Sequence, residues 1–124
     1  MNSGGLGRTY HQGEVIVKQG EPGDCMYVIQ QGEVEVILEK EEGDVILCTL
    51  RENDFFGEMA IFNKKPRSAT VRALGDARVL SVDKKNFLSR VHDDPSIAFR
   101  LVQTLSRRIQ DMDEQVGRTH RDTA

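Results

Sequence analysis

The sequence predicts a mainly β fold, an antiparallel sandwich or jelly roll, followed by C-terminal helices. Between residues 13 and 83, short apolar segments alternate with turn residues and provide about seven candidate strands, a spacing typical of antiparallel two-sheet folds. After residue 83 the apolar period changes to that of an amphipathic helix. The chain has 124 residues, of which 38% are hydrophobic, enough for one core and too few for a large multidomain enzyme.

The strands predicted in the first half are short runs of apolar and β-branched residues. Their ranges are 15–17, 25–30, 33–38, 45–50 and 55–56. Pro22 and Gly23 predict a turn before the second of them, because proline fixes φ and glycine tolerates a positive φ. Gln31 and Gly32 predict a reversal of the chain. After this reversal apolar side chains alternate with glutamates, which predicts one face towards the core.

The second half is predicted to hold two more strands and a short helix. The strands cover residues 69–73 and 77–82 and flank a turn at residues 75–76. The helix covers residues 83–91, with Asp83 as its N-cap. Three apolar side chains of this helix are expected to face inward: Phe87, Leu88 and Val91.

A long helix is predicted to follow. Asp94 suits its N-cap, Pro95 suits its first position and Gly117 is a helix stop. Its apolar positions recur at intervals of four and three, as in the seam of a coiled coil. They are Ala98, Val102, Leu105, Ile109, Met112 and Val116. The seam fits either a homodimer through residues 98–116 or one amphipathic helix that packs on its own strands.

The chain is expected to be one domain with four parts. They are a short N-terminal arm over 1–12, a body over 13–83, C-terminal helices over 84–117 and a polar tail over 118–124. We expect no membrane insertion, because no apolar stretch approaches the roughly 18 residues of a bilayer span. The start of the chain has no apolar signal core. Cys25 and Cys48 lack disulfide-scaffold or zinc-ribbon spacing, so we expect a cytoplasmic protein.

Charge separates one region from the rest. The net charge of −3 argues against a nucleic-acid-binding protein, since such domains usually carry a broad positive surface. Residues 55–92, however, hold eight basic residues against three acidic ones. This region is therefore expected to attract a small anionic ligand. The alternative is that charges of both signs merely solvate the strand faces.

The segment 55–71 carries the candidate chemistry. Gly57 opens a predicted single helical turn, where backbone N–H groups can approach a phosphate. The planar guanidinium of Arg67 can hold two phosphate oxygens, and Ser68 adds a hydroxyl. Glu58 then needs donors, such as the hydroxyl of a sugar next to the phosphate. The alternative is an ordinary ion pair between Glu58 and Arg67.

These motifs resemble the cyclic nucleotide-binding domain family over nearly the whole chain. The matching segments read GEVI at 13–16, QGEPGDCMYVI at 19–29, GEV at 32–34, FGEMA at 56–60 and PRSATV at 66–71. The resemblance implies an antiparallel β-roll, a double-stranded β-helix, with a short phosphate-binding helix and a long C-terminal helix. It implies a non-catalytic sensor that binds a 3′,5′-cyclic nucleotide, needs no cofactor and relays occupancy through the C-terminal helix.

The resemblance also implies roles for single residues. Arg67 stands where family members grip the exocyclic phosphate oxygens, and Glu58 where they accept from the ribose 2′-hydroxyl. The implied ligand-binding residues are Gly57, Glu58, Met59, Ala60, Arg67, Ser68, Ala69, Val36 and Leu47. Val36 and Leu47 are also explained as core positions. Ser68, where threonine is the pattern of cGMP binders, favours cAMP over cGMP.

Other functions remain open beside this one. A β-roll interaction module would have kept the fold without ligand binding. A cupin-type enzyme would need closely spaced histidine ligands, whereas His11, His92 and His120 are far apart. Where a family member reads adenine with adjacent threonine and serine, this chain has Met112 and Asp113. An effector is expected outside this chain, since the length after the long helix is too short for a DNA-binding domain.

Overall fold

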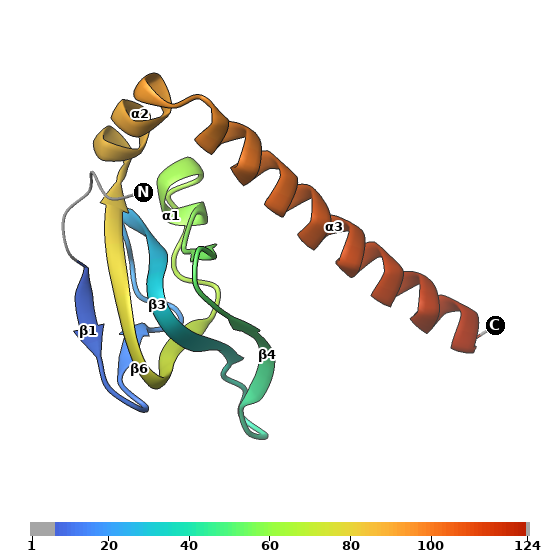
Figure 1. The fold of residues 1–124 in the computed structure, drawn as a ribbon. Coiled ribbons are helices and arrows are strands. Elements are labelled where there is room, and N and C mark those ends of the chain that lie inside the picture. Colours follow the sequence, from blue (N-terminus) through green and yellow to red (C-terminus); the bar gives the residue numbers. More distant parts are fainter. Residues whose placement is uncertain (1–6, 124) are drawn as a thin grey trace. The chain divides into compact units, whose positions relative to one another are not determined.

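The computed structural model of the chain describes the backbone of residues 7–123 and the side chains of residues 7–111. The chain divides into two compact units, Met1–Lys84 and Lys85–Ala124. In the first unit the described residues form a six-stranded antiparallel sheet and one short helix (Figure 1). The strands are β1 (Arg8–Tyr10), β2 (Val15–Val17), β3 (Cys25–Leu38), β4 (Val45–Leu50), β5 (Phe55–Phe56) and β6 (Thr70–Asp83), and the helix is α1 (Met59–Phe62). The predicted fold class is confirmed.

Two long strands, β3 and β6, form the centre of the sheet. They pair with each other, while β1 and β2 add to β6, and β4 and β5 add to β3 (Figure 1). The register of the central pair shifts between Ile29 and Glu33. Gly32 lies in this interval with a φ of 86°. A Cβ atom on it would lie 2.3 Å from the carbonyl oxygen of Asp76, so only glycine allows this close approach.

This irregular pairing replaces two reversals that the sequence predicts. Gln31 and Gly32 do not reverse the chain, and the two strands expected on either side of them are one strand, β3. In the same way the strands expected around Gly75 are one strand, β6. Both expectations are wrong, because a glycine with a positive φ suits a bulge inside a strand as well as a turn between strands.

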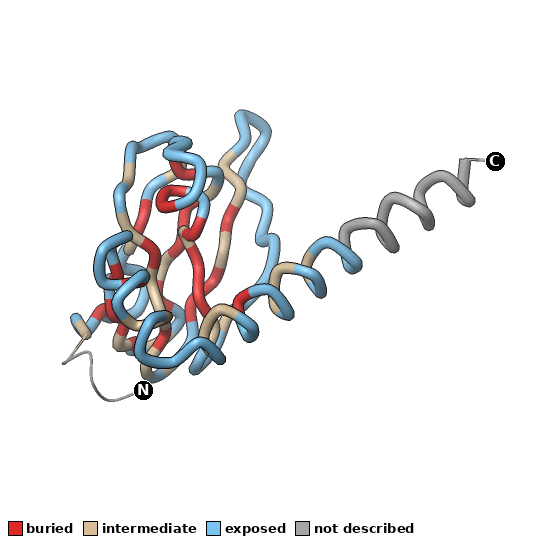
Figure 2. The backbone as a smooth tube through the Cα atoms, turned by 90° about the horizontal axis from the view of Figure 1, so that it is seen from above, coloured by how far each residue is buried: buried red, intermediate tan, exposed pale blue. Residues whose placement is uncertain are grey.

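The hydrophobic core is built mainly from the central strands. The buried residues follow the strands, and the exposed residues dominate the turns (Figure 2). The core comprises Tyr10, Val17, Ile29, Val34, Phe56, Val71, Ala73, Ala77 and Val79. Burying a valine or isoleucine of this kind contributes about 1.5–3 kcal/mol. Tyr10 belongs to β1, so residues 8–10, expected in the N-terminal arm, are part of the sheet.

The second half of β3 is covered on both faces. Val34 is fully buried in the core, as its alternation predicts. Successive residues of a strand point to opposite faces, and Glu35 and Ile37, on the other face, are also buried. Glu35 is stabilised there because Arg72 of β6 donates from Nε to its carboxylate at 2.7 Å. The expected single buried face is therefore too simple.

The second unit holds α2 (Lys84–Asp93), apart from its first residue, and α3 (Ser96–Thr123). Asp83 is the last residue of β6 and directly precedes α2. Phe87 is buried and Val91 half-buried, as expected, but Leu88 is 55% exposed, which corrects its inward placement. Leu88 follows directly on Phe87, about 100° further around the helix, and so leaves the buried stripe.

The long helix starts as predicted and ends later. Asp94 caps α3, since its carboxylate accepts from the Ser96 N–H at 3.1 Å and the Ser96 hydroxyl at 2.6 Å. These bonds lower the pKa of Asp94. Gly117 does not end α3, which continues to Thr123, because one glycine costs a helix only about 1 kcal/mol. Of the predicted seam, Val102 and Ile109 are exposed, while Met112 and Val116 lie outside the described side chains.

Candidate functional site

The candidate site begins at the turn between β5 and α1. Gly57 has a φ of 80°, a left-handed conformation that favours glycine. The helix α1 then forms one turn, in which the Ala60 N–H donates to the Gly57 carbonyl at 3.2 Å and the Ile61 N–H to the Glu58 carbonyl at 3.0 Å. Ala60 and Ile61 are buried and anchor this turn. The helical turn predicted after Gly57 is confirmed.

The guanidinium of Arg67 lies beside this turn and inside the protein. Arg67 is only 8% exposed, and its Nη1 donates to the Gly57 carbonyl at 3.2 Å. Its Nη2 lies 4.0 Å from Cys25 Sγ, and its Cζ lies 5.5 Å from the centroid of the Tyr27 ring. A carbonyl oxygen, a sulfur atom and a ring face are weak partners for a guanidinium compared with an oxyanion. Arg67 is therefore buried with contacts that a phosphate can improve.

Two glycines leave the space that this guanidinium occupies. A Cβ atom on Gly23 would lie 2.3 Å from Arg67 Cζ, and one on Gly57 would lie 2.6 Å from Nη1. Gly23 belongs to the loop between β2 and β3, which also holds the Arg67 backbone. The Gly20 N–H donates to the Arg67 carbonyl at 2.8 Å, and the Arg67 N–H donates to the Glu21 carbonyl at 2.9 Å. The loop thus fixes Arg67 by its main chain and encloses its side chain.

An aromatic pair supports the guanidinium from the sheet. Tyr27 and Phe56 are paired across β3 and β5, and their rings stack with centroids 5.1 Å apart. Burial, followed by the contact with Cys25, raises the pKa of the Tyr27 hydroxyl to about 12. The Tyr27 ring therefore stays neutral near pH 7 and does not compete with a bound anion for the charge of Arg67.

The other predicted ligand-binding residues of segment 55–71, called the cassette from here on, lie next to Gly57 or Arg67 in the chain. Glu58 is 9% exposed, between Gly57 and α1, and Met59 is the exposed first residue of α1. Ser68 is exposed and Ala69 half-buried, and both lie between Arg67 and β6. Because Arg67 contacts the Gly57 carbonyl directly, the two ends of the predicted phosphate-binding cassette meet in the structure.

The two predicted strand residues lie in the β3–β4 hairpin. Val36 is half-buried, packs against the core and pairs with Val71 of β6. Leu47 is 53% exposed and lies in β4 between the residues paired with Val36 and Ile37, where the register shifts. Val36 thus does contact the core, while Leu47 does not have the burial of a core residue. Their contact with a ligand stays a prediction.

The residues that enclose the guanidinium are not predicted from the sequence. Gly23 is predicted to be a turn residue, and Cys25 and Tyr27 are predicted to lie in a strand, without a place in the site. Their common partner, Arg67, is 42 positions from Cys25, and tertiary folding brings them together. Gly23 does not have the positive φ that its turn prediction suggests, and the structure shows that close packing, not a turn, requires glycine there.

Among the residues that the structure describes, no group of three or more His, Cys, Asp or Glu is placed to hold a metal ion. The Nδ1 atom of His11 lies 3.2 Å from Oδ1 of Asp76, and the side chain of His120 is outside the described residues. No helix in the described part of the chain is both long enough and apolar enough to cross a bilayer.

The fold and the site define a class of protein: an antiparallel β-rich domain, followed by helices, with a buried arginine at a glycine turn. Residues 7–94 match the sequence model of the cyclic nucleotide-binding domain. The chain belongs to this family, so the resemblance drawn from its motifs is confirmed.

Relatives in regulatory proteins agree with this assignment. The cAMP-activated global transcriptional regulator of Salmonella typhimurium is 36% identical over 110 residues, which cover 87% of this chain and 52% of the regulator. The chain thus spans about half the length of such relatives. The crystal structure of the Thermus thermophilus catabolite activator protein has a TM-score of 0.78 at 29% identity, and the match covers 88% of this chain and 52% of that one.

A solved enzyme also contains a similar domain. The EAL enzyme Bd1971 in its cAMP-bound form has a TM-score of 0.63, and in its cGMP-bound form 0.64. Both are 36% identical, over 82% of this chain and 27% of the enzyme. Domains similar to this one therefore occur in a transcriptional regulator and in an enzyme.

Proposed function

We propose that this domain binds cAMP in preference to cGMP and holds it without chemical change. The observation that carries the proposal is the buried Arg67 guanidinium, enclosed by Gly23 and Gly57 and bonded to a carbonyl oxygen. A cyclic phosphate offers two exocyclic oxygens, which share one negative charge, to the same fork of N–H donors. The exchange is favourable, because a hydrogen bond from the guanidinium to a charged phosphate oxygen is stronger than one to a neutral carbonyl oxygen.

The remaining roles follow from the cassette. The Glu58 carboxylate accepts from the ribose 2′-hydroxyl, and backbone groups of Gly57, Ala60 and Ser68 complete the phosphate cradle. Met59 and Ala69 line the same cradle. Val36 and Leu47 contact the base or the sugar from the β3–β4 hairpin. The small side chain of Ser68 supports the preference for cAMP. The proposed preference for adenine over guanine is independent of the proposed phosphate binding, which depends on Arg67.

Occupancy is relayed through the C-terminal helices. Ligand shifts an equilibrium between two states only by its difference in affinity for them. Phosphate capture by Arg67 draws the cassette inward, and α3 responds as a lid or at a homodimer seam through residues 98–116. The exposed Val102 and Ile109 support the seam. The effector is another chain or a further domain. Neither Cys25 nor Cys48 forms a disulfide in the structure, which fits a cytoplasmic location.

Calorimetry with ligand-free protein tests the proposal. We expect micromolar or tighter binding of cAMP and weaker binding of cGMP. Arg67→Ala is expected to weaken cAMP binding by about 10- to 100-fold, the loss of a charge-assisted hydrogen-bonding group. Arg51→Ala, which removes an exposed positive charge from the loop before β5, serves as the matched control and is expected to bind like the wild type.

Three results would contradict the proposal. No binding of either nucleotide by folded, nucleotide-free protein would favour a β-roll interaction module instead. An equal loss in Arg67→Ala and Arg51→Ala would mean that general charge, and not the buried guanidinium, attracts the anion. Turnover of cAMP in the same samples would show an enzyme rather than a sensor.

A further inference from the structure

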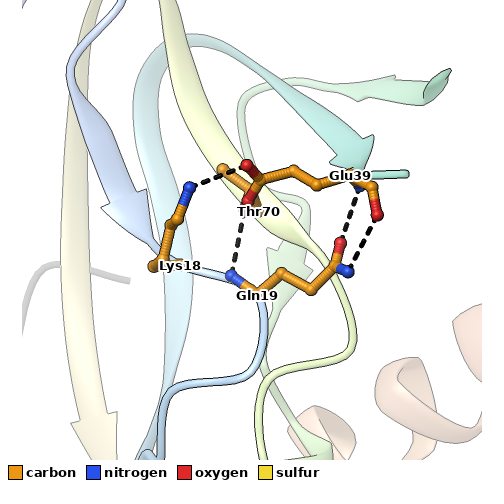
Figure 3. Close-up of polar contacts among 4 residues, drawn as sticks. All are labelled: Lys18, Gln19, Glu39 and Thr70. Atoms are coloured by element: carbon orange, nitrogen blue, oxygen red, sulfur yellow. Dashed lines mark hydrogen bonds and ion pairs between the residues drawn. The ribbon is translucent and has the colours of Figure 1, made fainter. Parts of the chain in front are cut away.

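Four polar residues join the segments that follow β2 and β3 to the start of β6 (Figure 3). Lys18 and Gln19 follow β2, Glu39 directly follows β3, and Thr70 begins β6. The Glu39 carboxylate accepts from Lys18 Nζ at 2.7 Å and from the Thr70 hydroxyl. The Thr70 hydroxyl in turn accepts from the Gln19 N–H at 3.0 Å. We call these four residues the Glu39 network.

The side chain of Gln19 closes the network. Its Nε2 donates to the Glu39 carbonyl at 3.1 Å, and its Oε1 accepts from the Glu39 N–H at 2.7 Å. One amide thus pairs with both backbone groups of one residue, as a neighbouring strand would. The end of β3 and the segment after β2 are therefore held at a fixed distance.

The Glu39 network leads directly to Arg67. Gly20 and Glu21, the next two residues after Gln19, hold the Arg67 carbonyl and N–H at 2.8 and 2.9 Å. Thr70 lies three positions after Arg67 in the chain and is the first residue of β6. A shift of the segment after β2 would thus move the Arg67 backbone and also Gly23, which encloses the guanidinium.

The hydrogen bonds of this network have little freedom to rearrange. Thr70 is only 4% exposed, and its hydroxyl is used both as donor and as acceptor. The bonds from Lys18 and Thr70 lower the pKa of Glu39, so its carboxylate is charged near pH 7. Without the hydroxyl, the Gln19 N–H and one oxygen of Glu39 would lose a partner.

We propose that Glu39 and Thr70 are positioning residues, which act on cyclic nucleotide affinity through the placement of Arg67 and do not touch the ligand. This rests on the proposed function of the domain. The sign of the effect distinguishes positioning from simple electrostatics. Removal of the negative charge of Glu39 would by itself strengthen the binding of an anion, whereas loss of positioning weakens it.

Calorimetric titration with cAMP tests this with two pairs of variants. Thr70→Val, which keeps the shape and removes the hydroxyl, is expected to bind cAMP about 3- to 10-fold more weakly, while Thr70→Ser binds like the wild type. Glu39→Gln is expected to weaken binding by a similar factor. Its matched control is Glu42→Gln, which removes the same charge from the same loop and is expected to change affinity less than about 2-fold.

A double-mutant cycle separates positioning from a structural role. In the Arg67→Ala background, Thr70→Val is expected to change cAMP affinity less than about 2-fold, because the residue it positions is gone. A second readout needs no ligand: the Nε–H resonance of Arg67 is expected to shift in Thr70→Val and Glu39→Gln, and to stay in place in Glu42→Gln.

The possible failures are distinct. If the wild type binds no cyclic nucleotide, the proposed function fails and this inference with it. If the wild type binds and both Thr70→Val and Glu39→Gln bind equally well, only the positioning role is wrong. A full loss that persists in the Arg67→Ala background would also overturn it, since the network would then act on another part of the site. Glu39→Gln decides the matter if Thr70→Val does not fold.

Discussion

At position 23 the missing side chain decides where the Arg67 guanidinium lies. The backbone of Gly23 does not have a positive φ, so alanine can adopt the same conformation. Its Cβ atom would nevertheless lie 2.3 Å from Arg67 Cζ, Nε and Nη2. These atoms are the end of a flexible side chain, which can move away at low cost. Gly23 is thus a requirement of the site and not of the fold.

We therefore predict that Gly23→Ala lowers cAMP affinity by about 10-fold and leaves the thermal unfolding temperature nearly unchanged. The loss arises because the displaced guanidinium no longer presents its donors to the phosphate. Calorimetry and thermal unfolding of the same samples measure both quantities.

The matched control for this prediction is the double variant. Gly23→Ala combined with Arg67→Ala is expected to bind cAMP no more weakly than Arg67→Ala alone, because nothing remains to be displaced. A large drop in unfolding temperature in Gly23→Ala, or a further loss of affinity in the double variant, would assign Gly23 to the fold instead.

Among the elements, the paired strands β3 and β6 show most clearly where a particular residue type is required. Gly32 and Gly75 have φ values of 86° and 77° in the region where both strands bend. Space distinguishes them. A Cβ atom on Gly32 would lie 2.3 Å from a main-chain oxygen of β6, whereas nothing lies within 4 Å of one on Gly75. A main-chain oxygen in the centre of a sheet cannot move aside without breaking the pairing.

We predict that Gly75→Ala costs about 1 kcal/mol of unfolding free energy, the cost of a left-handed alanine, and that Gly32→Ala costs at least about 3 kcal/mol. Urea denaturation of the two variants measures the difference, and each serves as the control of the other. Equal losses would mean that φ alone, and not the close approach to β6, sets the requirement for glycine at residue 32.

This bend also shows where sequence reasoning succeeds and fails. Local patterns found the β4 and β5 strands, the turn after Gly57 and the Asp94 cap, because each depends on a few adjacent residues. The same patterns misread Gly32, because a bulge and a reversal use the same backbone conformation and differ only in the distant partner strand. Arg67 and Gly57 were found by motif, whereas Gly23 and Tyr27 depend on contacts that no local pattern contains.

For the whole molecule, the apolar stripe of α3 raises the question of assembly. Val102 and Ile109, seven residues apart, are 59% and 60% exposed within one chain. A helix that leaves large side chains exposed at heptad spacing is typical of a seam that a second helix covers. In the homodimer proposed above, these side chains are buried between the two helices of the seam.

We predict a dimer in sedimentation experiments, and a rise of its dissociation constant by about 100-fold or more in Ile109→Asp, since an unpaired carboxylate is costly to bury. Gln110→Asp adds the same charge at an exposed neighbouring position and is expected to leave the dimer intact. A wild-type chain that sediments as a monomer at high concentration would contradict the prediction and assign the stripe to packing within one chain.

The order of the central strands affects how the chain folds during its synthesis. Because β3 ends at Leu38 and β6 begins at Thr70, every residue of the Gly57–Arg67 contact lies in the loop that this pair closes. Closing such a loop costs chain entropy before the sheet compensates for it, and pairings distant in sequence form slowly. The nascent chain is thus expected to complete the proposed nucleotide site only after β6 has left the ribosome. Ligand is expected to slow unfolding rather than to accelerate folding.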